Sequence, residues 1–186
     1  MSTIVSFSEI KGKHEHRGGI DESLAYKRVG DIDYSSLPYM SNIVFPDFLD
    51  EYVAYGMLAK KFVGWMQTEI FGIGGRVLCK VTELKKGYLS AFVPATYALE
   101  DEGAMWKGDR ILLDKRLAEL NPYLAVEPIL NAMAHYTAYM EGRPYRNGDV
   151  EFEKYLRDNC LPSALDGRFN MMSSIKILDK FVYDEL

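Results

Sequence analysis

With 186 residues, the chain is long enough for one domain with a sizeable hydrophobic core. Its hydrophobic share of 48% and aromatic share of 13% exclude an intrinsically disordered chain. The net charge of −5 argues against sequence-independent DNA binding, which needs a concentrated basic surface, so a nucleic-acid partner is not indicated. No run approaches the roughly 18 apolar residues of a membrane span, and the N-terminus lacks the pattern of a signal peptide. We therefore expect a cytoplasmic globular protein that is not attached to a membrane.

Two cysteines, Cys79 and Cys160, are too few for a disulfide framework, and neither belongs to a CxxC pair. We expect both to be free thiols that are buried or half-buried. Adjacent basic residues could form a local nucleic-acid patch, although such pairs are more often ordinary solvated surface; they are Lys60-Lys61, Lys85-Lys86 and Lys115-Arg116.

Residues 1–46 contain few periodic signals, and we expect them to form an N-terminal extension that packs on the core. Residues 2–10 alternate weakly and could be a short strand or a docking arm. His14 and His16 lie in a polar, glycine-rich stretch. Two histidines at this spacing could chelate a metal, but solvated side chains are the more common outcome.

From Asp47 onward, apolar residues recur at helical spacing and predict a helix that runs to about Glu69 and stops at Gly72. Its buried stripe comprises Phe48, Leu49, Tyr52, Val53, Ala59, Phe62, Val63 and Met66. Gly56 and Gly64 weaken this helix by about 1 kcal/mol each and could allow another element to approach closely.

The sequence pattern of residues 77–113 predicts a small antiparallel sheet. Residues 77–81 and 88–93 are typical of strands, and residues 85–87 between them favour a hairpin. Residues 99–108, which contain three acids and two glycines, suggest a loop. Residues 110–113 then form a third strand.

We expect a short helix at residues 115–120. The apolar spacing that follows predicts a central helix with Pro128 in its first turn and Gly142 as its stop. Its apolar face holds Val126, Ile129, Leu130, Met133, Thr137 and Met140. Residues 150–160 form a second amphipathic helix, capped by Asp149 or Asn147, whose inward side chains are Phe152, Tyr155 and Leu156. Residues 163–186 are too apolar to be free, so we expect a tail folded on the core, either as strand or as helix.

Asn131 and His135 lie four residues apart on the central helix, which is the spacing of the two histidines in the zinc-peptidase pattern HExxH. Here the five residues read NAMAH. With ILL at 111–113, ILNAMAHY at 129–136 and GRPYRNGDVEF at 142–152, the segment from about 47 to 160 resembles the SprT-like domain of Spartan-type zincin metallopeptidases. The resemblance implies an α+β fold with a minimal zincin core at residues 47–162.

The same resemblance implies that the catalytic site is degenerate. The first zinc histidine of the family falls on Asn131, the catalytic glutamate on Ala132, and the second zinc histidine on His135. The third histidine would lie near residues 147–149, where there is none. Catalytic zinc needs three protein ligands and a carboxylate base for its water, so no metal or other cofactor is expected.

The degenerate site leads to the hypothesis that the chain is a non-catalytic pseudo-zincin that binds a protein partner. A groove lined by Asn131, His135, Tyr136 and Tyr145 could hold a peptide or protein. Small, acidic, degenerate domains suit accessory proteins of phages and mobile elements that target a host protein or a protein–DNA complex. The oligomeric state stays open.

Two alternatives remain. The chain could be a metal-dependent peptidase in which His135 combines with other ligands, either Glu141, Asp149 or Glu151, or His14 and His16. It could also be an α+β domain with no relation to zincins. No Walker-type loop, GxSxG or CxxC motif points to another chemistry.

Overall fold

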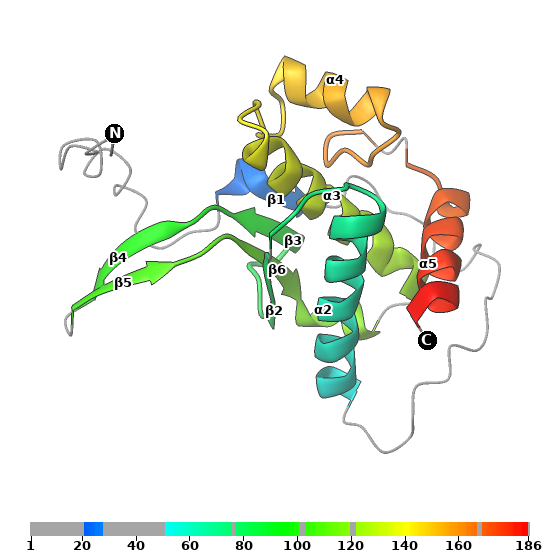
Figure 1. Ribbon diagram of the computed structural model, residues 1–186, viewed down its shortest axis with the longest axis horizontal. Helices are drawn as coiled ribbons and strands as arrows, with labels where there is room; N and C mark the ends of the chain where they lie inside the picture. Colours follow the sequence, from blue (N-terminus) through cyan, green and yellow to red (C-terminus); the bar gives the residue numbers. More distant parts are fainter. Residues whose placement is uncertain are drawn as a thin grey trace.

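The protein, described here from a computed structural model, has an α+β fold in which helices pack against a mixed four-stranded sheet (Figure 1). The structure describes residues 21–27, 51–75, 77–100, 103–119, 122–166 and 169–185. In chain order the elements are η1 (Glu22–Leu24), β1 (Ala25–Lys27), α2 (Glu51–Glu69), β2 (Leu78–Thr82), β3 (Tyr88–Val93), β4 (Thr96–Glu100), β5 (Gly103–Lys107), β6 (Arg110–Asp114), η3 (Lys115–Glu119), α3 (Pro122–Met140), α4 (Val150–Asp158) and α5 (Met171–Glu185).

Several expectations for the N-terminal extension lie outside the described residues. They include the possible strand at residues 2–10, His14 and His16, and the beginning of the helix at residues 47–50. Within the described ranges, no helix has the length and apolar character needed to cross a membrane.

The sheet has the order β1-β3-β6-β2, with β6 antiparallel to β3 and parallel to β2. The predicted hairpin between residues 77–81 and 88–93 is therefore wrong, because β6 lies between these strands. The turn after β2 is tied to the end of β6, since the Leu84 N–H donates to the buried Asp114 carboxylate at 2.8 Å. Local alternation predicts that a segment is a strand, but it does not identify the neighbour with which the strand pairs.

The predicted loop at residues 99–108 is also wrong, because β4 and β5 form a second, two-stranded sheet there. Its register runs from Thr96↔Lys107 to Glu100↔Gly103, and Figure 1 shows it projecting beyond the larger sheet. This ribbon extends the β3–β6 pair, in which Val93 is paired with Arg110. Continued pairing satisfies backbone groups that a loop would leave to water, even though the acids and glycines are typical of loops.

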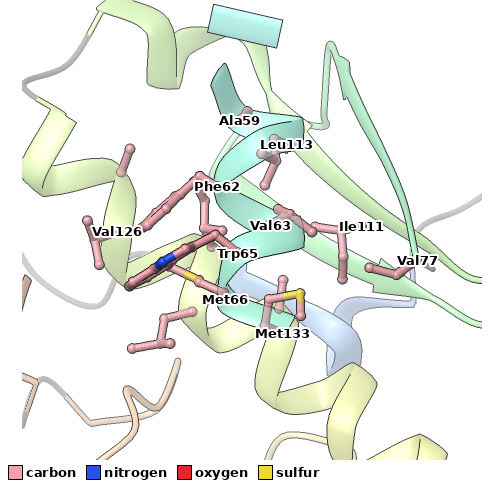
Figure 2. Packing of buried hydrophobic residues seen from close by; sticks show 14 of the residues in the cluster. Ala59, Phe62, Val63, Trp65, Met66, Val77, Ile111, Leu113, Val126 and Met133 are labelled. Carbon is pink, nitrogen blue, oxygen red and sulfur yellow. The ribbon is translucent and has the colours of Figure 1, made fainter. Parts of the chain in front are cut away.

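The main core lies between one face of the sheet and helices α2, α3 and α5. Figure 2 shows residues of α2, α3 and β6 that meet in it. Phe92, Ile111 and Leu113 are fully buried on this face of the sheet. From α2 the predicted residues Ala59, Phe62, Val63 and Met66 are buried, and the helix ends at Glu69 as expected. The anticipated close approach at Gly56 and Gly64 is wrong, because an added Cβ would have no neighbour within 4 Å at either position.

The C-terminal tail is helical, which decides between the two conformations left open by its sequence. Helix α5 packs on the core through Leu178 and Phe181, both buried. The Phe181 ring lies 4.9 Å from that of Phe62 in α2.

Helix α3 begins at Pro122, so the prediction that Pro128 occupies its first turn is wrong. Both prolines match the pattern of a helix start, and the packing selects the earlier one. Pro128 lies inside the helix, where its carbonyl oxygen accepts a hydrogen bond from the buried Ser90 hydroxyl at 2.6 Å. The predicted end is confirmed: Gly142 has φ 68°, and Arg143 N donates to Ala138 O at 2.9 Å.

Helix α4 begins as predicted, with Asp149 as its N-cap. The Asp149 carboxylate accepts from Glu151 N and Phe152 N at 2.9 and 3.3 Å. Phe152 and Leu156 are fully buried, while Tyr155 is half-buried.

Candidate functional site

Asn131, Ala132 and His135 lie on α3 and are all buried. Asn131 and His135 are one helical turn apart, and neither has any exposed surface. A fully buried polar side chain needs a partner for each of its polar atoms, or it lowers the stability of the fold. The hydrogen bonds of these two side chains therefore define what the site can do.

His135 is held by the chain that follows α3. Its Nδ1 atom is hydrogen-bonded to the main-chain carbonyl of Tyr145, and its ring lies 4.5 Å from that of Phe152 in α4. A carbonyl oxygen only accepts, so Nδ1 carries the proton, and Nε2 of the neutral ring is an acceptor. Burial lowers the pKa of His135 to about 4, despite opposing effects from Tyr145, Asn147 and Asp21. The ring is therefore neutral near pH 7.

Asn147 approaches His135 from the turn between α3 and α4. Its Nδ2 atom donates to Ala25 O at 3.2 Å, and its main-chain N–H donates to Ser23 O at 2.8 Å. These bonds orient the amide and leave Oδ1 buried without a partner. The Asn147 side chain is close enough to raise the pKa of His135. It forms no hydrogen bond with neutral Nε2, because both facing atoms are acceptors.

Asn131, like Asn147, has an amide donor with a partner and an amide acceptor without one. Its Nδ2 atom donates to Pro162 O at 2.8 Å, and its buried Oδ1 has no partner. Three buried acceptors thus lack a donor: Asn131 Oδ1, His135 Nε2 and Asn147 Oδ1. We call these three side chains the polar centre.

The polar centre does not suit a catalytic zinc ion. Zinc sites in proteins use imidazole, thiolate and carboxylate ligands, whereas two of these three groups are neutral carboxamides. Ala132, which is 1% exposed, has no carboxylate that could activate a water molecule. Across the described ranges, no three histidine, cysteine or acidic side chains are arranged to hold a metal ion.

The carboxylates of the alternative ligand set are likewise not assembled around His135, while His14 and His16 lie outside the described residues. Glu141 and Glu151 are exposed, and Asp149 is engaged in capping α4, whereas His135 is fully buried. Glu141 forms an ion pair with Arg143 at 3.0 Å. The structure therefore does not bring these carboxylates to the imidazole.

The open groove predicted beside α3 is wrong for Asn131, His135 and Tyr136, because all three are covered. Tyr136 is only 2% exposed and packs 5.7 Å from Phe92 in the main core. Tyr145 is half-buried, with its ring 5.3 Å from that of Tyr139. Residues from η1, β1 and the 145–149 turn close this side of the molecule.

A surface pocket of about 240 Å³ lies nearby, between the turn after α3 and the outer side of α4. It is lined by Arg143, Pro144, Glu151, Lys154, Tyr155, Asp158 and Asn159. Tyr155 stacks on Phe152, whose ring is tilted against that of His135, so Phe152 lies between the pocket residue Tyr155 and the polar centre. Its two basic and two acidic side chains balance, which gives it no strong preference for a charged ligand.

The basic pairs expected at the surface form ion pairs with acidic side chains. Lys61 pairs with Glu185, Lys85 with Glu22, Lys115 with Glu83, and Arg116 with Asp114. These contacts reduce the free positive charge that a phosphate backbone would require.

The cysteines differ from one another. Cys79 is half-buried, and burial raises the pKa of its thiol to about 12. The expectation that both thiols are covered is wrong for Cys160, which is exposed because it follows the end of α4.

Sequence reasoning missed the role of residues 21–27 and of Asn147. Asn147 was a possible helix cap, and only the turn geometry directs it towards His135. Leu24-Ala25-Tyr26 was the available signal for β1, but an apolar triplet is too short to predict a strand.

Neither a protein-family model nor a curated protein nor a solved structure matches the chain, so its function is inferred from the geometry above.

Proposed function

We propose that this chain is a pseudo-zincin: a SprT-like domain without metal or catalytic base that acts as a binding or inhibitory protein. The observation that carries the proposal is the polar centre. Asn131 and His135 lie where the resemblance assigns two zinc ligands, and Asn147 lies in the segment 147–149 near which it places the third. Only one of the three is a histidine; Asn131 and His135 are fully buried, and so is the Oδ1 atom of Asn147.

The order of the elements supports the same proposal. A long helix (α2), a sheet (β2, β3 and β6), the helix that carries Asn131 and His135 (α3) and a following helix (α4) occur in the sequence expected of a minimal zincin. Many small α+β domains share such an order, so the polar centre has more weight than the fold.

The proposed partner is a protein, either alone or in a protein–DNA complex. The net charge of −5 and the ion-paired lysines disfavour direct binding to a phosphate backbone. An accessory protein encoded by a phage or a mobile element, directed against a host factor, fits a small catalytically inactive domain.

The test is the metal content and the proteolytic activity of the untagged protein after incubation with zinc and removal of excess metal. We expect no stoichiometric zinc by mass spectrometry and no cleavage of an unfolded protein substrate. Stoichiometric zinc that is lost in a His135→Ala variant, together with cleavage that a chelator abolishes, would overturn the proposal.

A further inference from the structure

Residues 21–27 form a small unit that we call the strap. It comprises η1 and β1 and pairs antiparallel with β3, so it is the edge strand next to the polar centre. In the described part of the chain it is the only segment that precedes α2. Without it, the backbone groups of β3 that face β1 would have no partner there, and β3 would become an open sheet edge.

The strap packs outside the main core. Ala25, which is 1% exposed, belongs to a separate cluster with Leu84, Tyr88 and Ala91. Its Cα partner is Ala91, and the pairing is irregular between Tyr26 and Lys27. Removing the strap would therefore expose this satellite cluster but leave the packing among α2, α3 and β6 in place.

The ion pairs that fasten the strap are peripheral, whereas the side chains of Leu24, Ala25 and Tyr26 are buried. Asp21 pairs with Arg146 at 2.6 Å and Glu22 with Lys85 at 3.2 Å, both on partly exposed side chains. Pairs of this kind contribute little to stability. The Tyr26 hydroxyl donates to Glu127 of α3 at 2.6 Å.

A further set of contacts recognises the backbone of the strap. Asn147 donates from N to Ser23 O and from Nδ2 to Ala25 O, while β3 supplies a strand edge. Ser23 lies in the 3-10 turn η1, whereas Ala25 begins the extended segment that lies along β3. This is the mode of recognition in which a peptide adds a strand to a sheet edge.

We propose that the strap is an autoinhibitory contact, occupying in cis a site on β3 and Asn147 that takes a peptide of a protein partner with the same turn followed by a short extended segment. The proposal rests on the binding function proposed above and adds to it the site and its regulation. The partner peptide would resemble the strap: an acidic residue for Arg146, a small residue four positions later against Ala91, and then a tyrosine that reaches Glu127.

The test uses a fluorescent peptide of residues 20–28 and the full chain with an Ala25→Glu substitution. A charged side chain cannot fit at a position 1% exposed, so the strap is released while the acceptor residues stay unchanged. We expect the intact chain to bind the peptide weakly, because the tethered strap competes at an effective concentration on the order of millimolar. The Ala25→Glu chain should bind it roughly tenfold or more tightly.

Two matched controls test whether the added peptide binds in the same register as the strap. A peptide carrying Ala25→Glu should not bind either chain. Arg146→Glu in the opened chain should weaken binding of the natural peptide, and an Asp21→Lys change in the peptide should restore it. A folded Ala25→Glu chain that does not bind the natural peptide would overturn the proposal.

Hydrogen exchange of the unsubstituted protein tests the strap independently of any variant. Amides shared between β1 and β3 should exchange faster than those shared between β3 and β6, because the strap opens without global unfolding. Equal protection would identify the strap as an integral strand and overturn the proposal. A zinc-free chain that fails both strap tests would still be consistent with a pseudo-zincin, so the two proposals can fail separately.

Discussion

The Nδ1 atom of His135 donates a hydrogen bond to the main-chain carbonyl of Tyr145, ten residues further along the chain. This contact ties the last turns of α3 to the segment that leads into α4. It also fixes the tautomer, so that the lone pair of Nε2 faces Asn147. The histidine is therefore a structural anchor whose other nitrogen contributes to an acceptor-only polar centre.

Acidification should destabilise the fold through His135. Its pKa is about 4 in the folded protein against an ordinary value of 6.5, so the unfolded chain takes up a proton first as the pH falls. Stability is complete above pH 6.5 and declines as the pH falls towards 4, by about 3 kcal/mol in total. Urea unfolding of the protein and of His135→Gln at a series of pH values between these limits measures the difference.

Asp21 and Asp114 do not obscure this effect, because their lowered pKa values remove stability only below the ordinary value of 3.8. An identical pH dependence in the His135→Gln variant would contradict a buried neutral imidazole.

Restoring the zinc site and its catalytic base should require three substitutions, two for ligands and one for the base. Asn131→His with Ala132→Glu leaves Asn147 as a carboxamide, so we expect no stoichiometric zinc. Adding Asn147→His supplies a third imidazole at the position that faces His135, and zinc affinity should rise at least about tenfold in a chelator competition.

Asp149→His in place of Asn147→His is the matched control, because Asp149 caps α4 and is not directed towards the imidazole. Tight zinc binding by the double variant, or equal gains from His at 147 and 149, would show that the third position has been misidentified.

Gly64→Ala should stabilise the protein. Gly64 is exposed in the interior of α2, and an added Cβ meets nothing within 4 Å, so the change lowers the entropy lost on folding by up to about 1 kcal/mol. Gly142→Ala is the counterpart: its φ of 68° strains an alanine, and we expect a loss of about 1 kcal/mol. Thermal unfolding of both variants checks the two signs, and destabilisation by Gly64→Ala would mean that this face of α2 is covered.

The two thiols should react at different rates. Native protein treated with a thiol reagent near neutral pH should lose one fast-reacting thiol, at the exposed Cys160, whereas Cys79 is protected by burial and a pKa of about 12. Cys160→Ser should remove the fast phase, and unfolding in urea should equalise the rates. A fast phase that persists in Cys160→Ser would place Cys79 at the surface.

Local patterns predicted those elements that depend on one segment of chain. The second half of the apolar stripe of α2 (residues 59–66), the stop at Gly142 and the Asp149 cap follow from helical periodicity and backbone geometry, and all three are found in the structure. The beginning of α3 was misplaced because Pro122 and Pro128 present the same local signal.

Relations between distant segments could not be predicted in this way. Propensity, capping and hydrophobic spacing act over a few residues, so they were sufficient to predict an α+β chain and most of its helices, but not β1, β4 or β5. Three relations appear only once the chain is folded: β6 separates β2 from β3, residues 25–27 add an edge strand, and Asn147 meets His135. Each depends on which buried surfaces and backbone groups find partners across the fold, and no local pattern contains that information.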